Sequence, residues 1–238
     1  MKLLAIETST RQMGVAVTDG EAVLASYELL AEQPHGAELP GAVSRVLKAA
    51  GLTLKGVDGI VVDVGPGSFT GLRIGLAFVK ALAFTTKKPV VGISSLDVLA
   101  AGMPFASQPV CPILDAKQRN VYAALFRVEG EVPARQSDYW LGPTDDVLAG
   151  VAGPAIFLGD GCGRYRDRIL QRCPGAQFAP EETWWPKAAV LARLGRQRLQ
   201  ESGPDDPVRL VPMYLYPLDC SVRGPDRPTG VLPPLRAA

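Results

Sequence analysis

The stretch DVGPGSFTGLRIG, residues 63–75, decides how the fold is interpreted, because it leads from an apolar strand through a glycine-rich turn into a long helix. The residues before the turn, 57–64, form an almost continuous apolar run, which is typical of a strand covered on both faces of its sheet. The glycines permit positive φ angles and close approach of another backbone or a ligand. Free N–H groups at a helix start favour an anion. A tight strand-to-helix turn and an anion site are therefore both open interpretations. The turn comprises Gly65, Pro66, Gly67, Ser68, Phe69, Thr70, Gly71 and Gly75.

Three catalytic loops are excluded by the spacing within this turn. A Walker A loop needs Gly-Lys followed by Ser or Thr, and the turn contains no lysine. A dinucleotide fingerprint needs G-x-G-x-x-G, whereas Gly65, Gly67 and Gly71 give G-x-G-x-x-x-G. A nucleophile elbow needs G-x-S-x-G, which the residues around Ser68 do not form. We therefore expect no catalytic residue in the turn.

The helix predicted over residues 69–86 is apolar on most of its circumference. Between Leu72 and Phe84 only Arg73 and Lys80 are charged, and their spacing of seven places them on one narrow edge. Such a helix needs cover on more than one side. We expect one side to pack on the parent sheet and the other to meet a subunit, with a fully buried core helix as the alternative. Gly71 and Gly75, one turn apart, would let another helix approach closely.

Alternating strand and helix patterns predict an α/β protein with two related lobes. An apolar segment that ends in Glu7 is followed by a polar turn and a returning strand, and the same theme recurs about a hundred residues later at Asp115. The predicted lobes are residues 1–105, with the glycine-rich turn, and 106–217, followed by a proline-rich, mobile tail over 218–238. Predicted strands cover residues 3–6, 14–17, 22–30, 57–64, 89–93, 110–114, 121–128 and 155–158, and predicted helices cover 38–50, 69–86 and 187–199.

Composition limits the range of functions. The 238 residues carry a formal net charge of +1, whereas a protein that holds nucleic acid by itself normally shows a basic excess. Any contact with nucleic acid is therefore expected to depend on a partner. No apolar run approaches the roughly eighteen residues of a membrane span, and Glu7 interrupts the first apolar stretch too early for a secretory signal.

The cysteines suggest reduced thiols rather than a metal site or a disulfide framework. The four of them, Cys111, Cys162, Cys173 and Cys220, form no C-x-x-C pair, and the single histidine, His35, lies far from them in sequence. A structural metal site is not expected, and reduced thiols are typical of a cytoplasmic protein.

Acidic residues end or flank strands in both predicted lobes. Glu7, followed by Thr8 and Ser9, ends the first strand, Asp63 lies within the strand before the glycine-rich turn, and Asp115 ends the first strand of the second lobe. Carboxylates at strand ends can hold Mg²⁺ through water near a nucleotide. They can also accept hydrogen bonds from the N–H groups of the following turn. The second interpretation is favoured, and the first stays open.

Several short motifs together resemble the TsaB (YeaZ) family. They are Ile6-Glu7-Thr8-Ser9, GPGSFTGLRIG at residues 65–75, Ile93-Ser94-Ser95-Leu96, Asp115-Ala116-Lys117 with Val121-Tyr122, and Tyr214-Leu215 after Pro212. The resemblance extends to about residue 217, and its glycine-rich motif is highly specific. It implies an actin/Hsp70-like (ASKHA) fold in which mixed sheets are flanked by helices.

The same resemblance implies a non-catalytic scaffold subunit. Members of the family pair with the catalytic paralogue TsaD and the ATPase TsaE in a cytoplasmic bacterial complex, which transfers a threonylcarbamoyl group to adenosine in tRNAs that read codons beginning with A. ATP, ADP and a metal would belong to the partners, and tRNA would be met only in the complex. The implied association surface, which could also carry a self-dimer, comprises Leu39, Val43, Val46, Leu47, Leu72, Arg73, Leu76, Val79, Lys80 and Ala83.

One departure from the catalytic paralogue favours the supporting role. The paralogue carries a His-x-x-x-His metal pair just after the strand that follows its glycine-rich helix, and the matching positions here are Ser95 and Leu99. Neither residue can replace an imidazole ligand. The alternative function is an ATP-dependent kinase or ATPase of the same fold that acts on a small molecule, and it would depend on Glu7 and Asp63.

Overall fold

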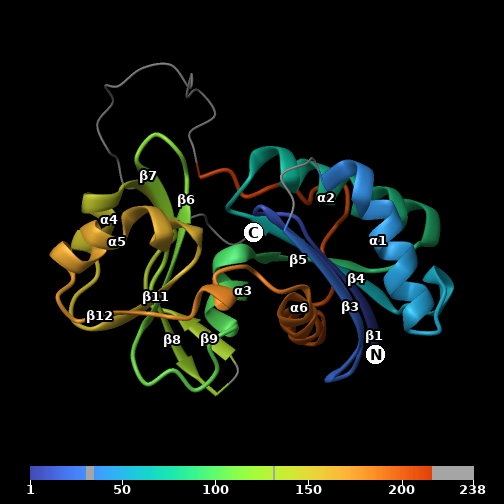
Figure 1. The fold of residues 1–238 in the computed structure, drawn as a ribbon. Helices are drawn as coiled ribbons and strands as arrows, with labels where there is room; N and C mark the ends of the chain where they lie inside the picture. The colour runs from blue at the N-terminus through green and yellow to red at the C-terminus, as the bar shows by residue number, and fades with distance from the viewer. Residues whose placement is uncertain (31–34, 131, 216–238) are drawn as a thin grey trace.

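The computed structural model describes residues 1–30, 35–130 and 132–215. Within this range the chain forms two sheets, each with its own core, joined through a short helix between them (Figure 1). The predicted tail over 218–238, together with Cys220, lies outside the described residues.

The first sheet has five strands in the order β3-β2-β1-β4-β5. Its strands are β1 (Lys2–Glu7), β2 (Gln12–Asp19), β3 (Ala22–Leu30), β4 (Gly59–Gly65) and β5 (Val90–Ser94). Strand β1 pairs antiparallel with β2 and parallel with β4. Helices α1 (His35–Ala49) and α2 (Phe69–Thr86) cover one face of the sheet, and α6 (Ala188–Ser202) covers the other (Figure 1).

Alternation along β1 explains how one strand supports both faces. Leu4 and Ile6 pack in the core beneath α1 and α2, whereas Leu3 and Ala5 pack in the core beneath α6. Successive side chains of a strand point to opposite faces. An unbroken apolar run is therefore what a strand between two helical layers needs.

The second sheet repeats the arrangement of the first. Its main path runs β10-β7-β6-β11-β12, and β8 joins β6 to β9 beside that path. The strands are β6 (Val110–Asp115), β7 (Asn120–Ala123), β8 (Phe126–Glu129), β9 (Val132–Arg135), β10 (Trp140–Pro143), β11 (Ala155–Leu158) and β12 (Ala176–Phe178). The β10-β7-β6 part is antiparallel and the β6-β11-β12 part is parallel, as in β3-β2-β1-β4-β5. Two lobes with the same topology confirm the predicted fold class. The helices of this half are α3 (Ser95–Ala101), α4 (Thr144–Ala149) and α5 (Asp160–Arg172).

Most predicted elements are confirmed, and two differ. Residues 22–30 and 69–86 form the predicted strand and helix at the expected bounds. The predicted strand 121–128 is divided into β7 and β8, because at Leu125 the backbone N–H donates to Ser137 Oγ instead of continuing the ladder. The Gly159-Asp160-Gly161 sequence, which lies outside every predicted helix, starts α5, with Gly159 as its N-cap at a φ of 104°.

The division of the chain into lobes also differs from the prediction. Residues 188–215 were expected in the second lobe, but α6 and the segment after it lie on the first. Leu191 and Ala192 pack in the first lobe's core, and a Cβ at Gly195 would lie 2.4 Å from Val61 side-chain atoms. The Asp205 N–H donates to the Val90 carbonyl at 2.8 Å, so the chain then follows the edge strand β5.

Helix α2 has the length and mean apolar composition of a membrane span, although Arg73 and Lys80 interrupt its apolar run. Its contacts explain the composition. Leu76, Val79 and Ala83 pack in the core of the first lobe, as the side chains of a sheet-covering helix do.

Candidate functional site

Two buried carboxyl groups lie at the ends of β1 and β4. Glu7 and Asp63 are both fully buried. Glu7 Oε1 accepts hydrogen bonds from the backbone N–H and the hydroxyl of Ser9, each at 2.6 Å. Asp63 Oδ1 accepts the Gly65 N–H at 2.6 Å. The favoured prediction, that these acids hold the turns after their strands, is therefore confirmed for this pair.

The remaining oxygens of the pair have no donor among the described residues. Burial and the neighbouring Asp63 carboxyl raise the pKa of Glu7 well above its ordinary value, and burial also raises the pKa of Asp63. A proton shared between the two carboxyl groups would satisfy both oxygens. The raised pKa values of both groups thus favour a protonated form of the pair over two charged carboxylates.

The glycine-rich turn packs directly on the turn between β1 and β2. The Ser68 N–H donates to the Ser9 carbonyl at 2.6 Å. A Cβ at Gly67 would lie 2.2 Å from that carbonyl, and one at Gly71 would lie 2.1 Å from the Thr8 carbonyl. The glycines therefore permit contact between two backbone segments of this chain. The expected approach of another helix at Gly71 and Gly75 was wrong, because Thr8 occupies that space.

This packing bears on the predicted nucleotide-proximal residues. The structure brings Glu7, Thr8, Ser9 and Asp63 together, and none is more than 1% exposed. The glycine-rich turn covers them at hydrogen-bonding distance. The arrangement therefore does not fit a nucleotide phosphate, which would have to displace the turn.

Asp115 lies in a different environment in the second lobe. Its carboxylate accepts hydrogen bonds from Lys117 Nζ at 3.0 Å, Arg164 Nη1 at 3.3 Å and the Tyr165 hydroxyl at 3.3 Å. Partial burial acts to raise its pKa, but the hydrogen bonds and charges of Lys117 and Arg164 outweigh burial and hold the pKa below the usual range. The Asp115 carboxylate is thus engaged by cations of its own lobe.

The positions that match the paralogue's metal pair are structural here. Ser95 opens α3 and its hydroxyl donates to the Pro66 carbonyl, while Leu99 is 1% exposed in the second core. In the described part of the chain, no three His, Cys, Asp or Glu residues cluster as metal ligands would. Cys111, Cys162 and Cys173 are buried free thiols.

Most of the predicted association residues belong to the core. Only Arg73 and Lys80 of the ten reach solvent, because the apolar periodicity marked the side of each helix that faces the sheet. Val79 is fully buried, so replacing it with a charged residue would disrupt the core and would not test an interface. The eight buried side chains are Leu39, Val43, Val46, Leu47, Leu72, Leu76, Val79 and Ala83.

The opposite side of α2 exposes large apolar side chains that the sequence prediction missed. Phe69 and Phe84 are 52% and 77% exposed, and the segment after α6 adds Val208 at 82%, Val211 at 62% and Tyr214 at 38%. We call these five residues, together with Arg73, the docking face. Singly exposed apolar residues are ordinary, whereas large contiguous apolar patches are typical of interaction surfaces.

Interactions within the docking face hold its parts in place. The Arg73 guanidinium lies 3.7 Å from the centre of the Phe69 ring, and Arg73 Nε donates to the Tyr214 hydroxyl at 3.0 Å. Lys80 Nζ donates to the Val208 carbonyl at 3.3 Å. Arg73 and Lys80, the two charged residues on one edge of α2, thus hydrogen-bond the segment after α6 to the helix.

Two lobes of the same strand order, joined by α3, define an actin-like (ASKHA) protein, and comparisons with known proteins narrow the class. A family model described as TsaD, tRNA N6-adenosine threonylcarbamoyltransferase, matches residues 29–150. The tRNA threonylcarbamoyladenosine biosynthesis protein TsaB of Bacillus subtilis is 30% identical over 219 residues, covering 90% of this chain and 94% of the relative. The TsaB of Escherichia coli is 32% identical over 221 residues, with the same two coverages.

A solved structure of YeaZ from Pseudomonas aeruginosa superimposes with a TM-score of 0.77 at 27% identity, covering 90% of this chain and 99% of that one. The chain therefore belongs to the TsaB family of tRNA threonylcarbamoyladenosine biosynthesis proteins, as its motifs predicted.

Proposed function

We propose that this chain is a non-catalytic, partner-dependent subunit that completes a TsaD-type tRNA threonylcarbamoyltransferase, with the docking face as its contact surface. The observation that carries the proposal is the row of exposed aromatic and aliphatic side chains on α2 and residues 208–214. Aromatic residues and arginine are enriched among the side chains that dominate binding energy at protein interfaces.

The residues at the positions where an actin-like enzyme would carry its nucleotide and metal sites favour a supporting role. Glu7 and Asp63 lie beneath the glycine-rich turn, and they hold turns of their own chain. Ser95 and Leu99 are a helix-start residue and a core residue. Chemistry that needs ATP, ADP or a metal is accordingly assigned to the partner subunits.

The part of the chain that the TsaD family model matches supports a TsaD-type partner. It matches residues 29–150, which include α1 and α2. A TsaD-type partner would therefore present related helices, and related surfaces can pair around a quasi-twofold axis. Small exposed residues on α1 and α2, such as Ala37, Ser44 and Ala77, would allow the helices to approach closely. A self-dimer through the same face would compete with this pairing.

The remaining parts of the proposal come from the family. A TsaE-type ATPase would join the assembly, tRNA would be bound by the complex, and the complex would work in the cytoplasm. These parts depend on the pairing with the TsaD-type subunit, so the pairing is tested first.

The test compares two phenylalanines of equal exposure. Phe84, on the docking face, and Phe105, on a loop of the second lobe, are each 77% exposed. Phe84→Asp is expected to weaken pairing with the TsaD-type subunit at least about tenfold, as loss of a central aromatic contact does. Phe105→Asp should leave pairing unchanged, and both variants should keep the wild-type circular dichroism spectrum. Equal affinities of wild type and Phe84→Asp for the TsaD-type subunit, measured by isothermal titration calorimetry, would show that the docking face is not the contact surface.

A further inference from the structure

We propose that a groove in the second lobe binds phosphate groups of an RNA backbone when the complex holds its substrate. This proposal rests on the proposed function and adds a contact surface for RNA to it. The groove has a volume of about 600 Å³ and lies between α5, the start of α4 and the turn joining β6 to β7. We call it the arginine groove, and its lining includes Arg119, Thr144, Asp145, Arg164, Arg168 and Gln171.

Helix α5 supplies a row of cations along the groove. Arg164 lies just before a kink at Tyr165 and Arg168 follows four residues later, both in the lining of the groove, and Arg172 lies four residues beyond Arg168, outside that lining. One helical turn separates Arg168 from Arg172, about 6 Å along the axis. An extended polyanion can contact such a row at several points, whereas a single small anion can contact only part of it. Arginine suits this role because its planar fork matches a phosphate group.

The turn opposite α5 holds a further arginine in a constrained conformation. Lys117, Gln118 and Arg119 have φ angles of 66°, 51° and 65°, which non-glycine residues seldom adopt. The Asn120 N–H donates to the Lys117 carbonyl at 2.8 Å, and the Thr144 N–H donates to the Arg119 carbonyl at 3.3 Å. These bonds hold the turn against its backbone strain. Backbone strain of this kind is concentrated at functional sites.

Arg119 is the most available cation of the groove. Its side chain is exposed and makes no hydrogen bond or ion pair with any residue that the structure describes. Arg168 and Arg172 of α5 are both held by one carboxylate, since Asp145 Oδ2 accepts Arg168 Nη2 at 2.6 Å and Asp145 Oδ1 accepts Arg172 Nε at 3.4 Å. One carboxylate thus orients two arginines and leaves donors of both for a further anion.

The balance of cations and carboxylates limits how strongly the arginine groove can bind RNA in the isolated chain. Asp145 and Asp167 lie in its lining beside Arg119, Arg164 and Arg168, so the cations exceed the carboxylates by one. A small excess predicts weak, salt-sensitive contact with RNA by the isolated chain. The groove would therefore contribute to RNA binding mainly in the complex, where other subunits hold the same RNA.

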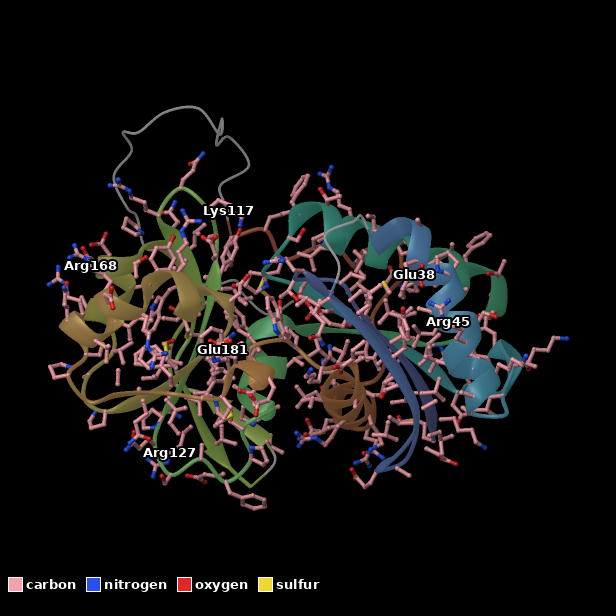
Figure 2. All side chains as sticks on the ribbon, in the orientation of Figure 1. Glu38, Arg45, Lys117, Arg127, Arg168 and Glu181 are labelled. Atoms are coloured by element: carbon pink, nitrogen blue, oxygen red, sulfur yellow. The ribbon has the colours of Figure 1, made fainter. Side chains whose placement is uncertain are left out.

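The experiment measures RNA binding by the assembled complex, using an unmodified transcript of a tRNA that reads a codon beginning with A. Fluorescence anisotropy gives Kd at several salt concentrations for the wild type, Arg119→Glu and Arg127→Glu. Arg127 is a matched control, because it is exposed and paired with Glu129 at 3.1 Å. Figure 2 shows Lys117 and Arg168 at one end of the second lobe and Arg127 at the other.

Arg119→Glu is expected to weaken RNA binding about tenfold and to lower the slope of log K against log salt by about one. Arg119→Lys should restore most of the affinity, and Arg127→Glu should remain within about twofold of wild type. In the transfer assay, the RNA KM should rise for Arg119→Glu while kcat is retained. Unchanged RNA affinity and salt slope for Arg119→Glu would overturn the proposal.

Two further results separate this proposal from related ones. A free nucleotide also carries phosphates, so ATP is titrated against wild type and Arg119→Glu. If Arg119→Glu weakens ATP binding and leaves RNA binding intact, the assignment to RNA is overturned. Failure of the proposed function is distinguishable, because it would appear as loss of pairing or of partner dependence in wild type itself.

Discussion

Replacing Gly75 with alanine should destabilise the first lobe through a single defined contact. A Cβ at this position would lie 2.2 Å from Thr8 Oγ1 and 3.4 Å from Thr8 Cβ and Cγ2. Thr8 is fully buried, so its side chain cannot move into solvent. Overpacking of this kind costs about 1–3 kcal/mol, and the better helix propensity of alanine returns roughly 1 kcal/mol. We expect a net loss of up to about 2 kcal/mol, which lowers Tm by up to about 8 °C in a chain of this size.

The contact with Thr8 can be tested by a double-mutant cycle. Thr8→Ala removes a hydroxyl that has no hydrogen-bond partner among the described residues together with the buried Cγ2 methyl, so by itself it should cost about 1 kcal/mol. In that background the nearest atom to the new Cβ is 3.4 Å away, an ordinary contact. Gly75→Ala should therefore become neutral or stabilising when Thr8 is alanine, giving a coupling energy above about 1 kcal/mol.

Thermal and urea unfolding followed by circular dichroism give the four free energies of the cycle. Gly41→Ala in α1 is the matched control, because its Cβ would meet only Arg45 Nη1 at 3.5 Å. It should stabilise the protein by up to about 1 kcal/mol. An equal loss for Gly75→Ala in both Thr8 backgrounds would refute the contact, and with it the assignment of the space beside Gly75 to the Thr8 side chain.

Two further predictions concern the acid pair and the segment after α6. Because the pKa of Glu7 is raised, the folded chain binds that proton more tightly than the unfolded chain, so its contribution to stability is complete at low pH and is lost as the pH rises above the ordinary value of 4.5. Glu7→Gln should therefore gain stability relative to wild type between about pH 5 and pH 8, as measured by urea midpoints, and an unchanged difference across that range would contradict the shared proton. Asp205 accepts the Gly92 N–H at 2.8 Å and Arg198 Nη2 at 3.0 Å, so Asp205→Ala should release residues 203–215 from β5 at a loss of about 1–3 kcal/mol. Limited proteolysis should then cut that segment faster, whereas wild-type cleavage rates would show that other contacts hold it.

The main features of the fold could be predicted because the local patterns agree with it. The apolar run of β4, the helix over 69–86 and the repeated acid-terminated strands each indicate their element without distant information. Helix α6 could not be assigned to a lobe in this way. Its packing on β4 depends on Gly195 and Val61, residues that lie far apart in sequence.

The association surface was harder to predict because hydrophobic periodicity marks burial and does not distinguish its causes. Leu76 and Val79 satisfy the pattern and are core residues, whereas Phe84 carries the exposed face of the same helix. Val208 and Val211 lie in a segment without regular secondary structure, where no periodicity exists to interpret. The one sequence signal for an exposed apolar surface was an aromatic residue outside the buried stripe of α2.

The central claim is that this chain supports a catalytic partner and does not itself catalyse the reaction. The most direct measurement is threonylcarbamoyl transfer to tRNA by the TsaD-type and TsaE-type subunits, with wild-type chain, with Phe84→Asp, and with neither. The account predicts full activity with the wild type, strongly reduced activity with Phe84→Asp, and only background activity without the chain. Equal transfer with and without the chain would contradict it.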